Sequence, residues 1–165
     1  MALSLGQFNT LVEEHAPALY RVAYRMVGDR HEAEDMVQEA FRSAWKSREA
    51  YEPDRGDRAW LASILRRRIV DRWRRNNLPT VTLGDAQPVP GIAGDDPLAA
   101  DYTDEMQLAL AGLPAELRET LLLVVVGELT HQEVADMLEI PLGTVLSRVS
   151  RARRRLREVL MGLKA

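Results

Sequence analysis

The stretch THQEVADMLEIPLGTVLSRVSRARRRLRE, residues 130–158, decides the fold of the second half of this 165-residue chain. Thr130 and Glu133 have capping-box spacing, which predicts that a helix begins directly after Thr130. The segment Glu139-Ile140-Pro141 predicts a tight turn, directly followed by a second helix. Two helices joined by so short a turn are typical of a helix-turn-helix.

The second of these helices has two contrasting faces. Successive residues of a helix are about 100° apart, and at this spacing its apolar residues share an arc of about 120°. These apolar residues are Val145, Val149, Ala152, Leu156, Val159 and Leu160. Arginines without an intervening acidic residue occupy the opposite side. The pattern predicts that the apolar face packs against the rest of the chain and the basic face enters a DNA major groove. The alternative is a solvated surface helix, but such a face normally mixes acids with bases.

In such a motif the first turns of the second helix reach base edges, and its later turns lie near phosphates. The residues expected to read bases are Leu146, Ser147, Arg148, Ser150 and Arg151. Those expected to bind phosphates are Arg154, Arg155 and Arg157. The motif by itself does not reveal what kind of regulator carries it.

The charges of the chain are unevenly distributed, although the whole sequence is mildly acidic. The 22 Lys+Arg and 25 Asp+Glu give a formal net charge of −3, which taken alone argues against a nucleic-acid partner. Six arginines lie between Arg66 and Arg75, six more lie between Arg148 and Arg157, and residues 76–117 contain no basic residue. Because arginine binds phosphate and guanine in a bidentate way, each compact block is a candidate nucleic-acid surface.

Residue content excludes or disfavours several classes of site. The chain has no Cys, so disulfides, thiolate metal sites and a cysteine nucleophile are excluded. The three His lack zinc-ligand spacing, and no phosphate loop or serine-nucleophile elbow occurs. No signal peptide or membrane-spanning run is evident. We therefore expect a cytoplasmic protein that binds rather than catalyses, with no metal, no cofactor and no small-molecule substrate.

Proline and glycine concentrate between Pro79 and Pro97, and this composition predicts an extended linker. Almost every other segment has helical periodicity. We therefore predict an all-α fold of two small domains, residues 1–77 and 103–165, joined by a flexible acidic linker over 78–102. Since each domain is near the lower size limit for independent folding, each is expected to hold one thin core of its own.

The first domain is predicted to contain a succession of amphipathic helices. Pro17 is expected to open a new helical segment, since its missing N–H is harmless in a first turn. Asp29 and Glu32 have capping-box spacing, which predicts another helix directly after Asp29. Residues 51–57 are a predicted loop by their Pro, Gly and Asp content, and a final helix runs over 58–76. The expected inward residues of the helix after Asp29 are Ala33, Val37, Ala40, Phe41 and Ala44.

Two surfaces of this domain admit alternative interpretations. The helix over 58–76 interleaves arginines with Trp60 and Trp73, a pattern that suits single-stranded or melted nucleic acid. Core packing of both tryptophans is the favoured alternative. On the preceding helix Asp35, Gln38 and Glu39 form a polar face, which is either simply solvated or docks a basic helical partner.

The two halves together resemble a known family. The segments AEDMVQEAFRSAW (33–45), RAWLASILRRRIVDRWRR (58–75) and the helix-turn-helix follow the order found in bacterial extracytoplasmic-function sigma factors, which direct RNA polymerase to promoters. The resemblance covers almost the whole chain outside the linker. It implies a promoter-specificity subunit that is not an enzyme, with core RNA polymerase, promoter DNA and an anti-sigma factor as partners.

The resemblance also implies roles for particular residues. Core polymerase would be bound by Asp35, Gln38, Glu39 and Phe41. The loop over 49–57 would capture a flipped base of the −10 element, and that element would be bound and melted by Arg58, Trp60, Arg66, Arg67 and Arg74. The −35 element would be read through Leu146, Ser147, Arg148, Ser150, Arg151, Arg154 and Arg155. Two residues depart from the family, because many members have Lys or Arg in place of Leu146 and Asn in place of Arg67.

Two other functions remain open at this point. A sigma-like decoy that titrates an anti-sigma factor needs no DNA-reading surface, so the dense arginine blocks argue against it. A conventional helix-turn-helix regulator acting as a dimer needs no separate first domain and no polymerase-binding segment, and the sequence has both.

Overall fold

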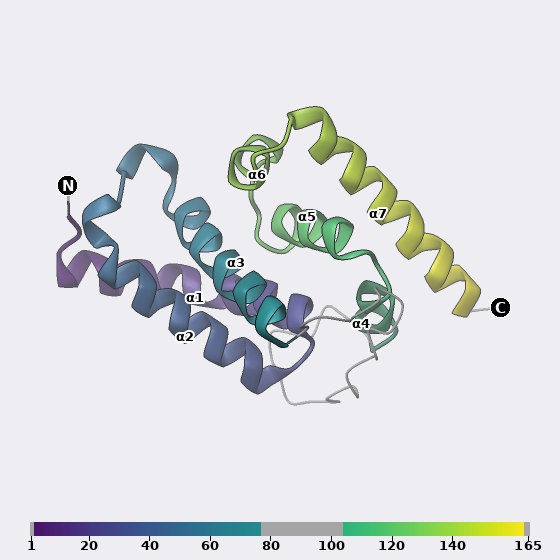
Figure 1. The fold of residues 1–165 in the computed structure, drawn as a ribbon, viewed down its shortest axis with the longest axis horizontal. Helices are drawn as coiled ribbons and strands as arrows, with labels where there is room; N and C mark the ends of the chain where they lie inside the picture. Colours follow the sequence, from purple (N-terminus) through teal and green to yellow (C-terminus); the bar gives the residue numbers. More distant parts are fainter. Residues whose placement is uncertain (1, 77–103, 164–165) are drawn as a thin grey trace.

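The computed structural model describes residues 2–76 and 104–163, and all regular structure within these ranges is helical (Figure 1). The predicted all-α class is therefore confirmed. The predicted linker, residues 78–102, lies outside the described residues. The helices are α1 (Leu5–Val27), α2 (Arg30–Lys46), α3 (Asp57–Asn76), α4 (Asp104–Ala111), α5 (Ala115–Val125), α6 (His131–Leu138) and α7 (Leu142–Leu163), with short 3₁₀ turns η1 (Arg48–Ala50) and η2 (Pro53–Arg55) before α3.

Helices α1, α2 and α3 pack together as the first lobe. Ser4 forms a complete capping box with Gln7 at the start of α1, and Asp29 accepts a hydrogen bond from the Glu32 N–H at 2.8 Å at the start of α2. The carboxylate of Glu32 pairs with Arg72 of α3 at 3.2 Å and so ties the two helices together. The predicted starts of α2 and α3 are confirmed to within one residue. Fully buried side chains from all three helices form the core, among them Leu19, Val22, Met36, Leu61, Leu65 and Ile69.

The predicted break at Pro17 is wrong, because α1 runs through this residue without interruption. Proline removes a backbone donor from a helix interior and normally costs about 3 kcal/mol. Here the helix buries Leu11 on one side of the proline and Leu19 and Val22 on the other. Packing of this long face against α2 and α3 outweighs the lost hydrogen bond, which is a tertiary effect.

Helices α4 to α7 form the second lobe, in which α7 packs along α5 and against α4 and α6. The capping box of α6 is complete, because Thr130 accepts from the Glu133 N–H at 3.0 Å and Glu133 accepts from the Thr130 N–H at 2.9 Å. Glu139 takes a left-handed conformation with φ 56° and turns the chain toward α7. The predicted pair of helices with a tight turn between them is therefore confirmed.

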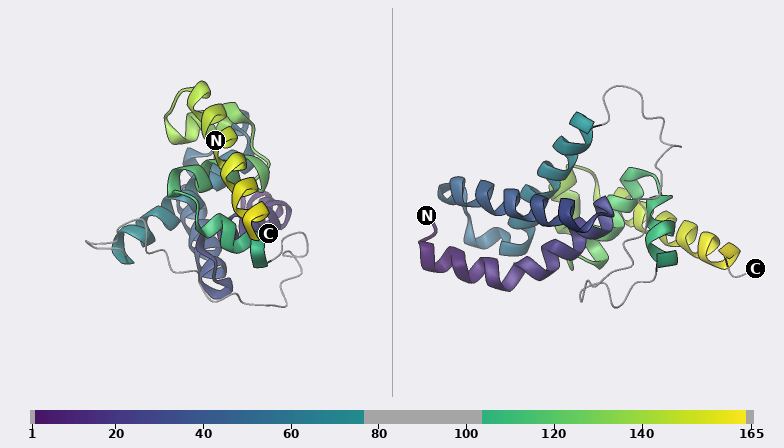
Figure 2. Two further views of the ribbon diagram at one scale, coloured as in Figure 1. Left: turned by 90° about the vertical axis from the view of Figure 1, so that its right-hand side faces the viewer. Right: turned by 90° about the horizontal axis from the view of Figure 1, so that it is seen from below.

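The two lobes lie against each other and share one continuous apolar core. Helix α1 contacts α4 and α5, and α3 contacts α6 (Figures 1 and 2). The expectation of a separate thin core in each domain is therefore wrong, because two small lobes bury more apolar area by packing on each other. The N-terminal end of α1 and the C-terminal end of α7 lie at opposite ends of the long axis (Figure 2).

Candidate nucleic-acid interface

Helix α7 presents an arginine-rich face to solvent. Its predicted apolar residues Val145, Val149, Ala152 and Leu156 are buried, and together they fix the orientation of the helix on the second lobe. Val159, also predicted to face inward, is 45% exposed because it lies at the edge of the apolar arc. The exposed basic residues are Arg151, Arg153, Arg154, Arg155 and Arg157.

The first turns of α7 carry the residues predicted to read bases. Four of them are exposed, namely Leu146, Ser147, Ser150 and Arg151. Leu146 is 50% exposed. Arg148 differs from the other four, because it is half-buried and its guanidinium lies 3.8 Å from the carboxylate of Glu116 at the start of α5. The structure thus gathers the predicted base-reading residues on one end of α7, with Arg148 held partly inward.

The α3 residues predicted to bind the −10 element differ in exposure. The exposed ones are Arg67 and Arg74, and the half-buried ones are Arg58, Trp60 and Arg66. The ring of Trp60 packs against Tyr51 with ring centroids 5.2 Å apart. Trp73 is also half-buried, with the guanidinium of Arg118 5.9 Å from its ring centre. Packing of both tryptophans against the core, the favoured interpretation of the sequence, is therefore confirmed.

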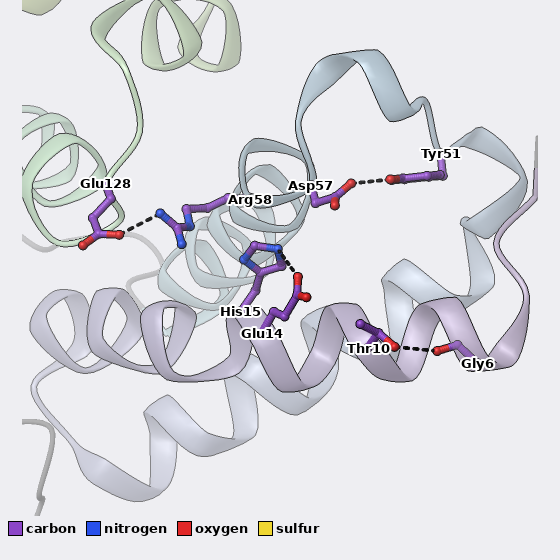
Figure 3. Close-up of polar contacts among 8 residues, drawn as sticks. All are labelled: Gly6, Thr10, Glu14, His15, Tyr51, Asp57, Arg58 and Glu128. Atoms are coloured by element: carbon purple, nitrogen blue, oxygen red, sulfur yellow. Dashed lines mark hydrogen bonds and ion pairs between the residues drawn. The ribbon is translucent and has the colours of Figure 1, made fainter.

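Two arginines of α3 pair with acidic residues of the second lobe. Arg58 donates from Nη1 to Oε2 of Glu128 at 2.7 Å (Figure 3). Arg66 pairs with Glu119 of α5, whose side chain retains 11% of its exposure. Both pairs join residues more than 50 positions apart in the chain. The family resemblance assigns both arginines to the −10 element, and in this structure each of them pairs with a carboxylate.

A hydrogen bond joins the loop before α3 to the first residue of that helix. The hydroxyl of Tyr51 donates to the carboxylate of Asp57, the first residue of α3 (Figure 3). This hydrogen bond, together with burial and the negative charge of Asp57, raises the pKa of Tyr51 to about 12. Gly56 takes φ 83° directly before the helix, a conformation that favours glycine. The predicted loop over 51–57 is confirmed, with η2 as its only regular turn.

The polar face of α2 points away from the core. Asp35 and Gln38 are exposed, and Glu39 is half-buried. Phe41, predicted to face inward, is half-buried and meets Phe8 edge-on with ring centroids 6.4 Å apart. The other predicted inward residues of α2 are buried, namely Ala33, Val37, Ala40 and Ala44.

Among the charged residues that join the lobes are three that sequence patterns did not identify. Two are the acidic residues Glu119 and Glu128. The third is Arg118, which donates to the backbone oxygens of Met26 and Leu113 at 3.3 Å each, and whose burial lowers its pKa from the ordinary value. For Arg118 and Glu119 the sequence held one signal, because a charged residue that is buried within an otherwise apolar helix such as α5 is almost always paired, whereas nothing in the sequence marked Glu128.

Other kinds of site were searched for in the described ranges. No group of three or more His, Asp or Glu side chains there could hold a metal ion. None of the helices in the described part of the chain combines the length and apolar character needed to span a bilayer.

The chain matches two family descriptions in the order in which its lobes occur. Sigma-70 region 2 matches residues 11–78, and Sigma-70 region 4 matches residues 103–156. The first match covers most of α1 together with α2 and α3, and the second covers α4 to α6 and most of α7.

Two curated proteins and one solved structure illustrate the similarity, each over more than nine-tenths of the chain. The ECF RNA polymerase sigma factor SigL of Mycobacterium tuberculosis is 35% identical over 98% of this chain and 93% of that protein. SigE of Mycolicibacterium smegmatis, also an ECF sigma factor, is 35% identical over 95% of this chain, which spans 63% of that relative's length. The sigma factor RpoE of Bartonella quintana, solved with the anti-sigma factor NepR, superposes with a TM-score of 0.76 at 28% identity, covering 93% of this chain and 96% of RpoE.

Proposed function

The chain belongs to the extracytoplasmic-function class of the sigma-70 family, whose members direct transcription, and we propose that it binds core RNA polymerase and selects promoters through the surfaces described above. The observation that carries this proposal is the exposed arginine face of α7, mounted on a capped helix-turn-helix. The same chain carries a region-2 lobe with an exposed acidic face on α2.

The work is divided between the two lobes. Residues 1–77 act as region 2, which binds core polymerase and the −10 element. Residues 103–165 act as region 4, which binds the −35 element, and residues 78–102 connect them. Each lobe is small, so both are expected to work only when mounted on polymerase.

Region 4 reads the −35 element as a duplex. The N-terminal turns of α7 enter the major groove, where Arg151 can bind guanine in a bidentate way and Ser147 and Ser150 can hydrogen-bond either base of a pair. Leu146 has no hydrogen-bonding group, so it contacts the C5-methyl group of thymine. Arg154 and Arg155 lie further along the exposed face and bind phosphates, which fixes the register of the helix.

Region 2 binds core polymerase and opens the downstream DNA. The exposed Asp35 and Gln38, with Glu39 beside them, dock a basic helical surface of the polymerase. Phe41 supports this face from below through its contact with Phe8. The α3 residues Arg58, Trp60, Arg66, Arg67 and Arg74 bind the −10 element, and the loop before α3 holds a base taken out of the duplex.

The protein is not an enzyme in this proposal, because the polymerase performs the chemistry. It acts in the cytoplasm, where the polymerase and the promoters are. An anti-sigma factor is a further proposed partner, and the complex of RpoE with NepR supports this.

Run-off transcription with purified core polymerase and a genomic promoter library tests the proposal. We expect transcripts from a defined set of promoters only when the protein is added. If the protein binds core polymerase but no promoter is transcribed, the decoy function replaces this one. If it does not bind core polymerase, the proposal fails.

A further inference from the structure

We propose that Leu146 makes promoter binding depend on the C5-methyl group of one pyrimidine in the −35 element, so that methylation of a cytosine at this position strengthens binding. The inference rests on the proposed role of α7 in reading the −35 duplex. It adds a covalent modification of DNA as a regulator of this protein. Its basis is an exposed apolar surface at the end of α7 that faces the groove.

Leu146 belongs to a small exposed apolar surface at the start of α7. Leu142, one turn earlier, is 41% exposed, and Leu146 is 50% exposed. Residues four positions apart lie on the same side of a helix, so the two leucines are neighbours. Gly143 follows Leu142 and leaves open space, since a Cβ added to it would meet nothing within 4 Å. A duplex can therefore approach both leucines without obstruction by the residue between them.

The packing of α7 fixes the position of Leu146. The preceding residue, Val145, is fully buried, and Val149 is buried on the same side of the helix. Leu146 thus lies where the packed face of α7 passes into the exposed face. Because the backbone that carries this leucine is anchored by its buried neighbours, little conformational freedom is lost when the side chain contacts a ligand.

A cavity of about 400 Å³ lies beside Leu146 and has two kinds of lining. Leu146 and Val149 supply apolar side chains, while Arg153, Arg154 and Arg157 supply positive charge. The arginines bind phosphates of a DNA strand, which positions that strand on the helix. The apolar part of the lining is then left for a group of the DNA that has no polar atom.

The major groove of DNA presents one such group. Among the atoms that the four base pairs expose there, the C5-methyl of thymine is apolar and the others are chiefly hydrogen-bond donors and acceptors. A polar edge placed against Leu146 would lose its water without gaining a hydrogen bond, which is unfavourable. Cytosine has only a hydrogen at C5, whereas 5-methylcytosine carries the same methyl group as thymine. Leu146 therefore distinguishes pyrimidines by the methyl group.

The surroundings of Leu146 favour DNA over an apolar protein partner. Ser147, Ser150 and Arg151 are exposed on the same turns of α7. Residues 142–157 contain no acidic residue. The centre of a protein–protein interface is normally depleted of charged residues, whereas this leucine lies among hydroxyl and guanidinium groups that suit bases and phosphates.

The test uses the full-length protein without polymerase. Duplexes that bind from a library with a randomised central segment define the sequence that α7 selects. In the selected duplex, each thymine of either strand is replaced in turn by uracil, which lacks only the methyl group. We expect one replacement to weaken binding about fourfold, the factor that corresponds to the ~0.8 kcal/mol of one buried CH₂ group. At that position, a pair of 5-methylcytosine with guanine should bind about fourfold more tightly than the unmethylated pair.

Three variants assign the effect to Leu146. Leu146→Ala removes the apolar contact, so it should bind the thymine and uracil duplexes equally and the methylated and unmethylated cytosine duplexes equally. Leu146→Met conserves volume and apolar character and should keep most of the discrimination. The matched control Ser147→Ala removes a polar contact from the next residue and should weaken binding to both members of each pair alike. Because both residues are exposed, each variant is expected to fold, which circular dichroism checks.

Several outcomes overturn the inference. They are the selection of no duplex sequence, the absence of any uracil replacement that weakens wild-type binding, and methyl discrimination that persists in Leu146→Ala. If Leu146→Ala binds every duplex as the wild type does but binds core polymerase more weakly, the residue serves a protein partner instead. The duplex measurements do not involve polymerase. Failure in run-off transcription would therefore overturn the sigma function, whereas methyl reading is decided by duplex binding alone.

Discussion

At the scale of single residues, the hydrogen bond between Tyr51 and Asp57 gives the loop before α3 a distinctive pH dependence. The folded protein raises the pKa of Tyr51 from 10.0 to about 12, chiefly through the hydrogen bond to Asp57. Since the folded pKa lies above the unfolded value, the contribution to stability is complete below pH 10 and is lost as pH rises from 10 to about 12. Absorbance of tyrosinate during a base titration should show one phenol that ionises late.

Two variants assign that late phenol. Tyr51→Phe should remove the late step from the titration. Asp57→Asn should move it back toward pH 10, because the hydrogen bond to the carboxylate, which is the main cause of the raised pKa, is lost together with the negative charge. A late step that persists in both variants would belong to another tyrosine.

The arginines of α7 differ in what their removal should cost. Arg151 is exposed, so Arg151→Ala should weaken binding of the −35 element by about 1–3 kcal/mol and reduce transcription that depends on this element. Core binding should remain intact. Arg148→Ala should weaken binding of the −35 element too, but it also removes the ion pair with Glu116 inside the lobe. Run-off transcription and core-binding assays on the same variants measure both effects.

The reciprocal test of Arg151→Ala changes the polar face of α2 on the first lobe. Asp35→Ala with Gln38→Ala should reduce core binding and leave binding of the isolated −35 duplex unchanged. Loss of core binding by Arg151→Ala would contradict the division of work between the lobes.

Most of the side chains that are exposed on α7 could be predicted from the sequence, because a helix with a strong apolar arc fixes its own orientation, and the exceptions are Val159 and Arg148. That Arg58 and Arg66 are paired with carboxylates could not be predicted from the sequence. Their partners are 70 and 53 residues away, and no pattern along a single chain encodes such a pairing.

At the scale of elements, the capping box of α6 is a local device whose removal can be predicted. Thr130→Ala leaves the Glu133 N–H without its side-chain acceptor and should lower the free energy of unfolding by about 1 kcal/mol. Thr130→Ser retains the hydroxyl and should restore most of the loss. Chemical denaturation of the three proteins checks the order, and equal stability of the alanine and serine variants would contradict the role of the hydroxyl.

Helix starts were predicted correctly at Asp29 and Thr130, where a capping residue marks them. The continuity of α1 through Pro17 was not, since it depends on apolar residues of α2 and α3 that only the folded lobe brings together. Local signals therefore locate helix ends well and helix interiors less well when a proline is present.

At the scale of the whole molecule, the shared core predicts how the protein unfolds. Because α1 packs on α5 and one apolar cluster runs through both lobes, they should unfold together in one cooperative transition. Scanning calorimetry should give matching calorimetric and van't Hoff enthalpies. Two resolved transitions would contradict a common core.

The sequence predicted two small helical lobes but not their contact. Helical periodicity assigns a buried face to each helix without saying which lobe covers it. The contact also depends on charged residues such as Arg118 and Glu119, which a helical pattern classes as surface residues until their partners are known.

The ion pairs of Arg58 and Arg66 also bear on how such a protein finds its target in a cell. Every arginine that reaches phosphate adds to sequence-independent attraction to the chromosome, which offers millions of competing sites. Two arginines that are paired with carboxylates of the same chain do not contribute to this non-specific binding. A larger share of molecules then diffuses freely and competes with other sigma factors for the limited pool of polymerase, instead of being stored along the genome.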